Sequence, residues 1–329
     1  MKKILVLGSN SFAGSVFVDE CLNADMNVVG VNRSPEQHDA FLPVKSNLRI
    51  ADYDFYQMNI NEDQDALQSL ITSFKPNVVV DYAAQSMVAE SWDNPDHWYL
   101  TNIVAKAKLT KFLMKADYLD QFIRISTPEV YGSTGEIITE TQLYSPSTPY
   151  AISQMATDIS LMAFHENLGF PVTITRAANY YGPGQQLYRI VPKTILSILK
   201  GTKLNLHGGG KSVRAFIHAK DSADGVIKII NQNKIGEIFQ FSTNEFVSIR
   251  ELVELICKKL NIDFNLAVEI GEDRIGKDQA YLMSSKKAKE ELDWDPQIDL
   301  SSGIDETIDW IKNNLDALNT MPLEYQHKA

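Results

Sequence analysis

Cysteine is scarce in this chain, and long apolar runs are absent. The 329 residues include only two cysteines, Cys21 and Cys257, which lie far apart in stretches with helical patterns. This spacing fits neither a disulfide framework nor a zinc site, so we expect two buried thiols. No apolar run approaches the ~20 residues of a membrane span, so no membrane partner is expected and a cytoplasmic location is predicted.

An excess of basic charge is missing as well. Lys and Arg number 31 against 42 Asp and Glu, which gives a formal net charge of -11. A nucleic-acid backbone is therefore not an expected partner, although a local basic pocket can still hold a small phosphorylated ligand. With 44% hydrophobic and 22% charged residues the chain has the composition of a soluble globular protein. Its length suits one large α/β unit or two closely joined lobes.

The chain opens with a strand, a glycine turn and a helix. The apolar run 4–7 leads into a turn that contains Gly8, Ser11 and Gly14, and an amphipathic helix is expected over 15–23. Such a turn brings backbone N–H groups and a helix N-terminus against a pyrophosphate. Ser11 stands where a middle glycine is usual, and a simple tight turn is the alternative interpretation.

The same alternation of strand and helix continues through the first half of the chain. Strands are expected over 26–31, 55–60, 77–82, 122–126 and 171–176, and helices over 62–74, 96–116 and 150–168. Repeated strand–helix units predict an α/β fold with a doubly wound, Rossmann-type parallel sheet. We expect a dinucleotide-binding domain over 1–177, with a return segment at about 215–243.

A smaller α/β lobe that binds substrate is expected over 178–329. The chain is predicted to break regular structure at 179–184 and to leave the sheet there. Beyond this point, helices are expected over 191–200, 249–260, 286–292 and 304–313, with a short strand over 204–206.

The ends of the second, third and fourth strands carry candidate cofactor contacts. These are Asn32, Arg33, Ser34, Asn59, Ile60, Ala83, Ala84 and Gln85. An acidic residue at the second strand end would bind an adenosine ribose, whereas an arginine accommodates a 2′-phosphate. Arg33 therefore favours NADP over NAD, and a solvated loop charge is an equally good reading of it. The small residues after the fourth strand let a cofactor approach the backbone.

Candidate catalytic groups follow the fifth strand. Thr127 and Glu129 come directly after it, and Tyr150 opens the helix that follows a proline-containing loop. Gln154 lies one helical turn beyond the phenol on the same face. Parallel sheets gather reactive groups at the carboxyl ends of their strands, so we expect these four side chains to meet there.

Three arginines beside turns of the second lobe form a possible diphosphate site. Arg189, Arg214 and Arg274 can each be an isolated surface charge, which is the default for any one of them. Together they can hold a diphosphate through bidentate contacts.

These motifs make the chain similar to the extended short-chain dehydrogenase/reductases, in particular to nucleotide-sugar 4,6-dehydratases and epimerases. The residues that carry the resemblance run in family order along nearly the whole chain. They are Gly8, Phe12 and Gly14, Ala83 to Ser86, Thr101-Asn102, Ser126 to Gly132, Pro149-Tyr150, Arg176 to Asn179, Tyr181 to Pro183, Arg214, and Arg274 to Asp278.

The resemblance implies a tightly bound NAD or NADP that takes a hydride from C4 of a nucleotide-linked hexose. Phe12, Tyr150 and Gln154 would join the strand-end residues in binding the cofactor. The implied substrate contacts are Ser86, Thr127, Asn179, Arg189, Arg214 and Arg274. It also implies a homodimer formed through the helices at 96–116 and 150–168, and a role in polysaccharide biosynthesis.

The resemblance further implies a division of chemical roles. Tyr150 would be the base for the C4 hydroxyl, assisted by Thr127, and Glu129 would remove the C5 proton before water is lost across C5 and C6. Pure epimerisation needs no C5 base, so Glu129 favours a dehydratase. A solvent-facing carboxylate at a strand end is the alternative reading of Glu129.

Two positions depart from the family pattern. Pro128 stands where dTDP-glucose dehydratases often carry an aspartate, and proline has no proton to give. Gln154 replaces the lysine that follows the catalytic tyrosine, and losing a cation at 4–6 Å costs roughly 1.4–4 kcal/mol of phenolate stabilisation. A slow enzyme, an engineered substitution and a cation from elsewhere all remain open. If Gln154 replaced a working lysine, Gln154→Lys should raise the rate most below pH ~8.

The sequence therefore leads to a 4,6-dehydratase as the first hypothesis, with two alternatives. Pro128 favours a nucleotide-sugar 4-dehydrogenase or epimerase. Gln154 and Ser11 favour a catalytically silent protein that binds NAD(P) and a nucleotide sugar.

Overall fold

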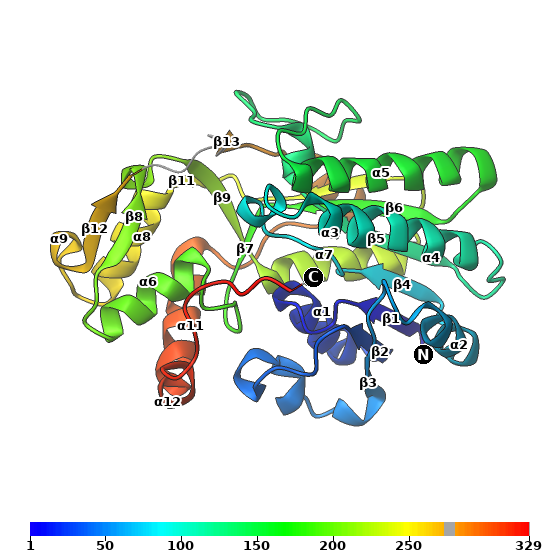
Figure 1. The fold of residues 1–329 in the computed structure, drawn as a ribbon, viewed down its shortest axis with the longest axis horizontal. Helices are drawn as coiled ribbons and strands as arrows, with labels where there is room; N and C mark the ends of the chain where they lie inside the picture. The colour runs from blue at the N-terminus through cyan, green and yellow to red at the C-terminus, as the bar shows by residue number, and fades with distance from the viewer. Residues whose placement is uncertain (273–279, 329) are drawn as a thin grey trace.

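A seven-stranded parallel sheet forms the centre of the molecule, which is described for residues 1–272 and 280–328 in a computed structural model (Figure 1). The strand order is β10-β6-β5-β4-β1-β2-β3. Its strands are β1 Lys3–Leu7, β2 Asn27–Asn32, β3 Tyr53–Gln57, β4 Val78–Asp81, β5 Gln121–Ser126, β6 Val172–Ala177 and β10 Ile238–Phe241. All neighbours in this sheet are parallel, which confirms the predicted doubly wound α/β fold.

Both faces of the sheet are buried, as apolar runs in parallel strands require. Ile4 and Val6 of β1 point into one hydrophobic core, and Leu5 and Leu7 point into the other. Helices α1 Phe12–Asn23, α7 Ala219–Gln232 and α10 Lys286–Leu292 cover the first face. Helices α2 Gln64–Phe74, α4 Ala105–Leu113 and α5 Pro149–Leu168 cover the second, and α5 lies alongside α4 in Figure 1.

The helix predicted over 96–116 contains a π-helical segment. Its parts are α3 Pro95–Tyr99, the π turn Leu100–Val104 and α4, in one continuous run. Asn102 in the π turn is buried. Its amide accepts a bond from Gln85 N at 2.9 Å and donates to Gln85 O at 3.0 Å and to Ser153 Oγ at 2.9 Å. Short π segments often occur at functional sites, and this one anchors the chain that follows β4.

The chain leaves the sheet after β6 and builds a second lobe. This lobe contains β7 Asn179–Tyr181, β8 Leu204–His207, β9 Val213–His218, β11 Phe246–Ser248, β12 Val268–Gly271 and β13 Ala280–Tyr281. Its helices are α6 Ile190–Leu199, α8 Ile249–Lys259, α9 Phe264–Ala267, α11 Leu300–Asn313 and α12 Leu315–Leu318. Between them, α7 and β10 return to the main sheet, and α7 packs against α1.

The predicted break at 179–184 and the predicted third strand are among the segments that differ from the structure. The expected break at 179–184 starts with a short strand, β7, which pairs with β9 because buried Tyr181 packs on Phe216 and His218. The third strand was expected over 55–60 but spans Tyr53–Gln57. As an edge strand it ends where its neighbour β2 ends, with Asn32 opposite Gln57. Asn59 and Ile60 therefore follow the strand.

The last residues of the chain return to the carboxyl edge of the sheet. After α12 the segment runs from the second lobe back over the first domain, and its end lies near α1 (Figure 1). Glu324 forms an ion pair with Lys193 at 2.8 Å, and Tyr325 packs on Tyr188. We call residues 321–328 the C-terminal tail.

The two thiols are buried in helices, as expected. Cys21 lies in α1 and Cys257 in α8, and both are free. No helix within 1–272 or 280–328 has the length and apolar character needed to cross a membrane.

Candidate active site at the carboxyl edge of the sheet

The turn after β1 forms a cradle that only glycine permits. Gly8 has a φ of 81°, and a Cβ there would lie 2.7 Å from Ala83 N; a Cβ at Gly14 would lie 2.3 Å from Gly8 O. A serine at position 11, where glycine is usual, has a structural reason. Its hydroxyl caps α1 by accepting a hydrogen bond from Gly14 N at 3.1 Å. The helix therefore begins at Phe12, earlier than predicted.

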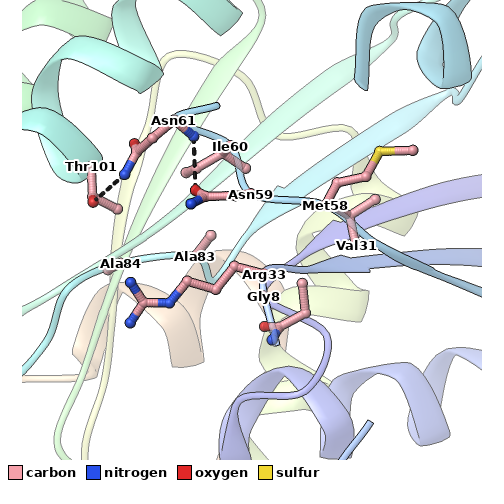
Figure 2. A pocket seen from close by; sticks show the side chains of 11 residues that line it. Gly8, Val31, Arg33, Met58, Asn59, Ile60, Asn61, Ala83, Ala84 and Thr101 are labelled. Atoms are coloured by element: carbon pink, nitrogen blue, oxygen red, sulfur yellow. Dashed lines mark hydrogen bonds between the residues drawn. The ribbon is translucent and has the colours of Figure 1, made fainter. Parts of the chain in front are cut away.

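A pocket beside this cradle brings together half of the predicted cofactor contacts. Figure 2 shows the lining residues, which come from the ends of β1 to β4 and from the π turn. They are Gly8, Val31, Asn32, Arg33, Met58, Asn59, Ile60, Asn61, Ala83, Ala84 and Thr101. Asn61 and Thr101, which bond at 3.0 Å, were not predicted as cofactor contacts. The glycine cradle and this pocket together fit a dinucleotide.

Seven predicted cofactor residues lie outside this pocket. Ser11 and Gly14 belong to the glycine cradle, Tyr150 and Gln154 belong to α5, and the other three are Phe12, Ser34 and Gln85. Phe12 is buried in the core beneath α1. Ser34 and Gln85 contact the C-terminal tail instead: Lys328 Nζ donates to Ser34 Oγ at 3.2 Å, and Gln85 Nε2 donates to Lys328 O at 2.7 Å. The tail thus spans the gap between the ends of β2 and β4.

Arg33 extends along the pocket, over Ala83 and Ala84 (Figure 2). Burial lowers the pKa of its guanidinium, and Arg33 is one of the residues that line the pocket. Its contact with a cofactor stays a prediction.

Tyr150 is the second residue of α5, and four groups from outside this helix act on its phenol. Thr148 caps the helix by accepting from Ala151 N at 3.1 Å, and Pro149 fills its first position. Burial raises the pKa of Tyr150 well above its usual value, and the charge of Glu129 acts in the same direction. A hydrogen bond with Thr127 and the charges of Arg124 and Arg189 lower it.

The segment after β5 forms a single 3₁₀ turn, Pro128–Tyr131. Thr127 caps it by accepting from Glu129 N at 3.3 Å, and Pro128 occupies the first position, where no backbone donor is needed. The proline therefore has a structural explanation. It is buried and supplies no acid, and Glu129 stays half-buried beside the phenol.

Gln154 lies one turn beyond Tyr150, as predicted, and it is buried against a cation that sequence reasoning missed. The guanidinium of Arg124 in β5 donates to Gln154 Oε1. Arg124 also bonds Asp81 of β4 at 3.2 Å, and Asp81 accepts a bond from Lys106 of α4. Charged residues inside the apolar runs of β4 and β5 were the available sign, because central parallel strands have no solvent-facing side.

The predicted substrate contacts are less closely gathered. Arg189 occupies the N-cap position of α6 without a capping side-chain bond, and it is near enough to Tyr150 to affect its pKa. Arg214 is buried in β9 and donates to Val213 O at 2.7 Å. Ser86 and Asn179 are exposed. Arg274 lies outside the described residues, so the proposed trio of arginines stays a prediction.

A glycine cradle, a parallel sheet and a tyrosine at the start of the helix after β5 define an extended short-chain dehydrogenase/reductase. Residues 5–307 match the model of a family described as GDP-mannose 4,6 dehydratase. The chain belongs to this family of nucleotide-sugar 4,6-dehydratases.

Curated relatives agree with this assignment. A dTDP-glucose 4,6-dehydratase from Xanthomonas campestris is 30% identical over 94% of this chain and 93% of its own length. The human dTDP-D-glucose 4,6-dehydratase is 30% identical over 95% of this chain and 91% of its own length.

Solved structures share the whole fold. A dTDP-glucose 4,6-dehydratase from Streptomyces venezuelae with NAD bound has a TM-score of 0.87 and 28% identity, covering 96% of this chain and 98% of its own. A UDP-glucose 4-epimerase from Thermotoga maritima with UDP-glucose has a TM-score of 0.86 and 26% identity, covering 95% and 99%. The first contains NAD, so the expectation of NADP from Arg33 is not confirmed.

Proposed function

We propose that this chain is an NAD-dependent nucleotide-sugar 4,6-dehydratase. The observation that carries the proposal is the position of Tyr150, bonded to Thr127 and beside Glu129, at the sheet edge that also carries the glycine cradle. Related enzymes of this name and fold support it.

NAD is the proposed cofactor, held by the cradle and by the pocket in Figure 2. Bound there, its nicotinamide would accept the hydride from C4 and return it to C6. The test is the dissociation constant of each dinucleotide by calorimetry, with NAD expected to bind more tightly than NADP. Tighter NADP binding would reinstate the reading of Arg33 as a 2′-phosphate contact.

The chain's own residues supply the proton transfers. Tyr150 takes the proton of the C4 hydroxyl, and Thr127 orients the phenol through their hydrogen bond. The resulting ketone acidifies C5, whose proton Glu129 removes. Because Pro128 carries no acid, Glu129 is also the group placed to return that proton to the departing C6 hydroxyl, which leaves as water. C5 regains a proton when the hydride returns to C6, and the proton that Tyr150 took from the C4 hydroxyl balances it.

In this proposal the two parts of the chain bind different ligands. Residues 1–177 with the return segment 215–243 bind the dinucleotide, and residues 178–329 bind the nucleotide sugar through Arg189 and Arg214. The course of α7 and β10, which rejoin the main sheet, supports the division.

A homodimer is part of the proposal. Leu100 and Val104 lie on the π turn, and Ile152 and Ile159 lie on neighbouring α5, with 39 to 47% of each side chain exposed. Four exposed apolar side chains on two packed helices fit a contact with a second copy.

The experiment is incubation with dTDP-, GDP-, CDP- and UDP-hexoses, followed by mass analysis of the sugar nucleotide. We expect loss of one water from one of them, and Tyr150→Phe should reduce the rate roughly 10²–10⁴-fold. Retention of the C6 hydroxyl in every case would contradict the proposal.

A 4-epimerase or 4-dehydrogenase is the second candidate, favoured by Pro128 in place of an acid. It predicts a product of unchanged mass or one that has lost only two hydrogens. A catalytically silent protein would bind the nucleotide sugar in a calorimeter without turnover.

A further inference from the structure

Five charged side chains form a buried cluster beneath Tyr150. We call them the ionic cluster: Lys106, Asp81, Arg124, Asp158 and Arg176. All five are at most 2% exposed. Arg176 Nη2 bonds Asp158 at 2.9 Å, and Arg124 Nη1 bonds Asp81 at 3.2 Å. These charges have left water, so their mutual balance decides the local electrostatic potential.

The cluster carries one more cation than it has anions. When all are ionised, three positive side chains face two carboxylates, which leaves a net charge of +1. The pairing places the excess on one side. Asp158 forms an ion pair with Arg176 at 2.9 Å, and its other oxygen lies 3.9 Å from Arg124 Nε. Asp81 is shared between Lys106 and Arg124.

The environment of Lys106 agrees with this imbalance. Burial lowers its pKa to about 8, the charge of Arg124 acts in the same direction, and Asp81 opposes both. Burial is the largest cause and acts whatever the charge count, so only the smaller effect of Arg124 reflects the extra cation.

Gln154 connects the excess charge to the phenol. Its carbonyl oxygen accepts from Arg124 Nη2, and it lies one helical turn from Tyr150 on the same face of α5. We propose that Arg124, held against Gln154, is a positioning residue that supplies the positive charge needed to ionise Tyr150. This inference rests on the proposed function, in which Tyr150 is the base.

The other charges that face the phenol do not meet this need. Glu129, from the turn after β5, opposes ionisation. Arg189, at the start of α6, favours it but is partly exposed, so solvent weakens its effect. Thr127 bonds the phenol but carries no charge. Arg124 is fully buried, where an opposite charge acts with little screening.

The test measures ionisation at position 150 without turnover. In the full chain Tyr150 is replaced by 3-nitrotyrosine, whose phenol ionises at lower pH and absorbs visible light when ionised. We expect Arg124→Gln to raise the titration midpoint by about 1–3 pH units. Arg124→Lys should leave it nearly unchanged. Equal midpoints in all three proteins would overturn the proposal.

A control separates local from overall charge. Arg49→Gln removes one positive charge from an arginine paired with Asp25 and Asp52 near the surface, and it should not move the midpoint. A shift equal to that of Arg124→Gln would show a general effect of charge and overturn the proposal.

The Arg124→Gln protein should remain folded, because Lys106 and Asp81 are left as a one-to-one pair. Lys106→Met is a second variant, since it leaves Asp81 to neutralise Arg124 alone. Measured below pH 8, it should also raise the midpoint, by less than Arg124→Gln. An unchanged titration midpoint in a folded Lys106→Met protein would contradict the claim that the net charge of +1 in the ionic cluster acts on the phenol.

A rescue distinguishes an electrostatic role from a structural one. Adding Gln154→Lys to Arg124→Gln should restore the midpoint and the acid side of the pH–rate profile. Gln154→Lys alone should give no gain, because it sets an ammonium against the buried guanidinium. A gain from the single variant would favour the idea that Gln154 simply lacks a lysine. The nitrophenol titration needs no substrate. Its result therefore tests the role of Arg124 even if the chain catalyses a different reaction.

Discussion

His218 is a buried neutral base at the junction of β9 and α7. Its Nδ1 accepts from Lys220 N at 3.4 Å and caps the helix, and a Cβ at Gly182 would lie 2.7 Å from its Nε2. Burial lowers the pKa of His218 to about 4, with a further contribution from the charge of Lys220. Glu306 lies 3.7 Å from Nε2 and is partly exposed, so it does not offset burial.

This lowered pKa predicts a loss of stability in acid. In the unfolded chain the His218 imidazole is protonated below pH ~6.5. In the folded protein it stays neutral until the pH falls to about 4. The free energy of unfolding should therefore fall by roughly 3 kcal/mol across this window. Urea denaturation at pH 7 and 4.5 measures it, with His218→Asn as a control that keeps a capping acceptor. Equal losses in both proteins would contradict the assignment to His218.

At the scale of single residues, the sequence predicted which candidate groups lie together better than it predicted what surrounds them. Thr127, Glu129, Tyr150 and Gln154 follow a strand or open a helix, positions that chain order reveals, and the structure places them at one sheet edge. Arg124 stands inside an apolar run. Its partners come from separate elements, so the ionic cluster depends on tertiary packing and leaves no local periodicity.

Among the elements, the C-terminal tail has the clearest consequence for the cofactor. Lys328 connects Ser34 to Gln85 across the dinucleotide crevice, and His327 bonds His97 at 2.9 Å while stacking on Trp98. A bound dinucleotide would leave only after these contacts open.

Deleting residues 324–329 should therefore accelerate cofactor release by about tenfold or more, if the tail contributes at least ~1.4 kcal/mol to retention. Met321 and Leu323, which pack on the core of the second lobe, are kept so that folding is not disturbed. The dissociation rate of NAD is measured by stopped-flow chase. Lys193→Gln, which loses only the exposed pair with Glu324, is the control. Slower release after deletion would mean that the tail competes with the cofactor.

Element boundaries were predicted well where the hydrophobic period is strong. The helix that starts at Ile249 and the helix over 286–292 match the structure closely. The third strand was misplaced because its ladder is set by β2, which local sequence does not show. The π turn within 96–116 was not predicted either, because the apolar residues of this segment are spaced as in an ordinary helix. The hydrogen bonds of Asn102 in this turn join residues distant in sequence, which local sequence does not show.

At the scale of the whole molecule, the proposed dimer can be tested by introducing one charged side chain at the proposed interface. Ile159 on α5 is 46% exposed beside the π turn. Ile159→Glu places a carboxylate in the proposed contact and should convert a dimer into a monomer, as measured by sedimentation velocity.

Leu266→Glu is the matched control, because Leu266 is 66% exposed but lies on α9 in the second lobe. It should leave the mass unchanged. A dimer that survives Ile159→Glu but not Leu266→Glu would move the interface to the second lobe.

The shared carboxylate of the ionic cluster constrains how such a site can arise by successive mutation. Asp81 introduced without a cation would be an unpaired buried charge, a cost of about 3–5 kcal/mol, a large share of the 5–15 kcal/mol that holds a domain folded. Arg124 introduced while a lysine stands at 154 would meet a like charge. The changes are therefore contingent on order: Lys106 with Asp81 first, then glutamine at 154 together with Arg124. Ancestors with Asp81 but neither Lys106 nor Arg124 should be rare, because that intermediate lacks a partner for its buried charge.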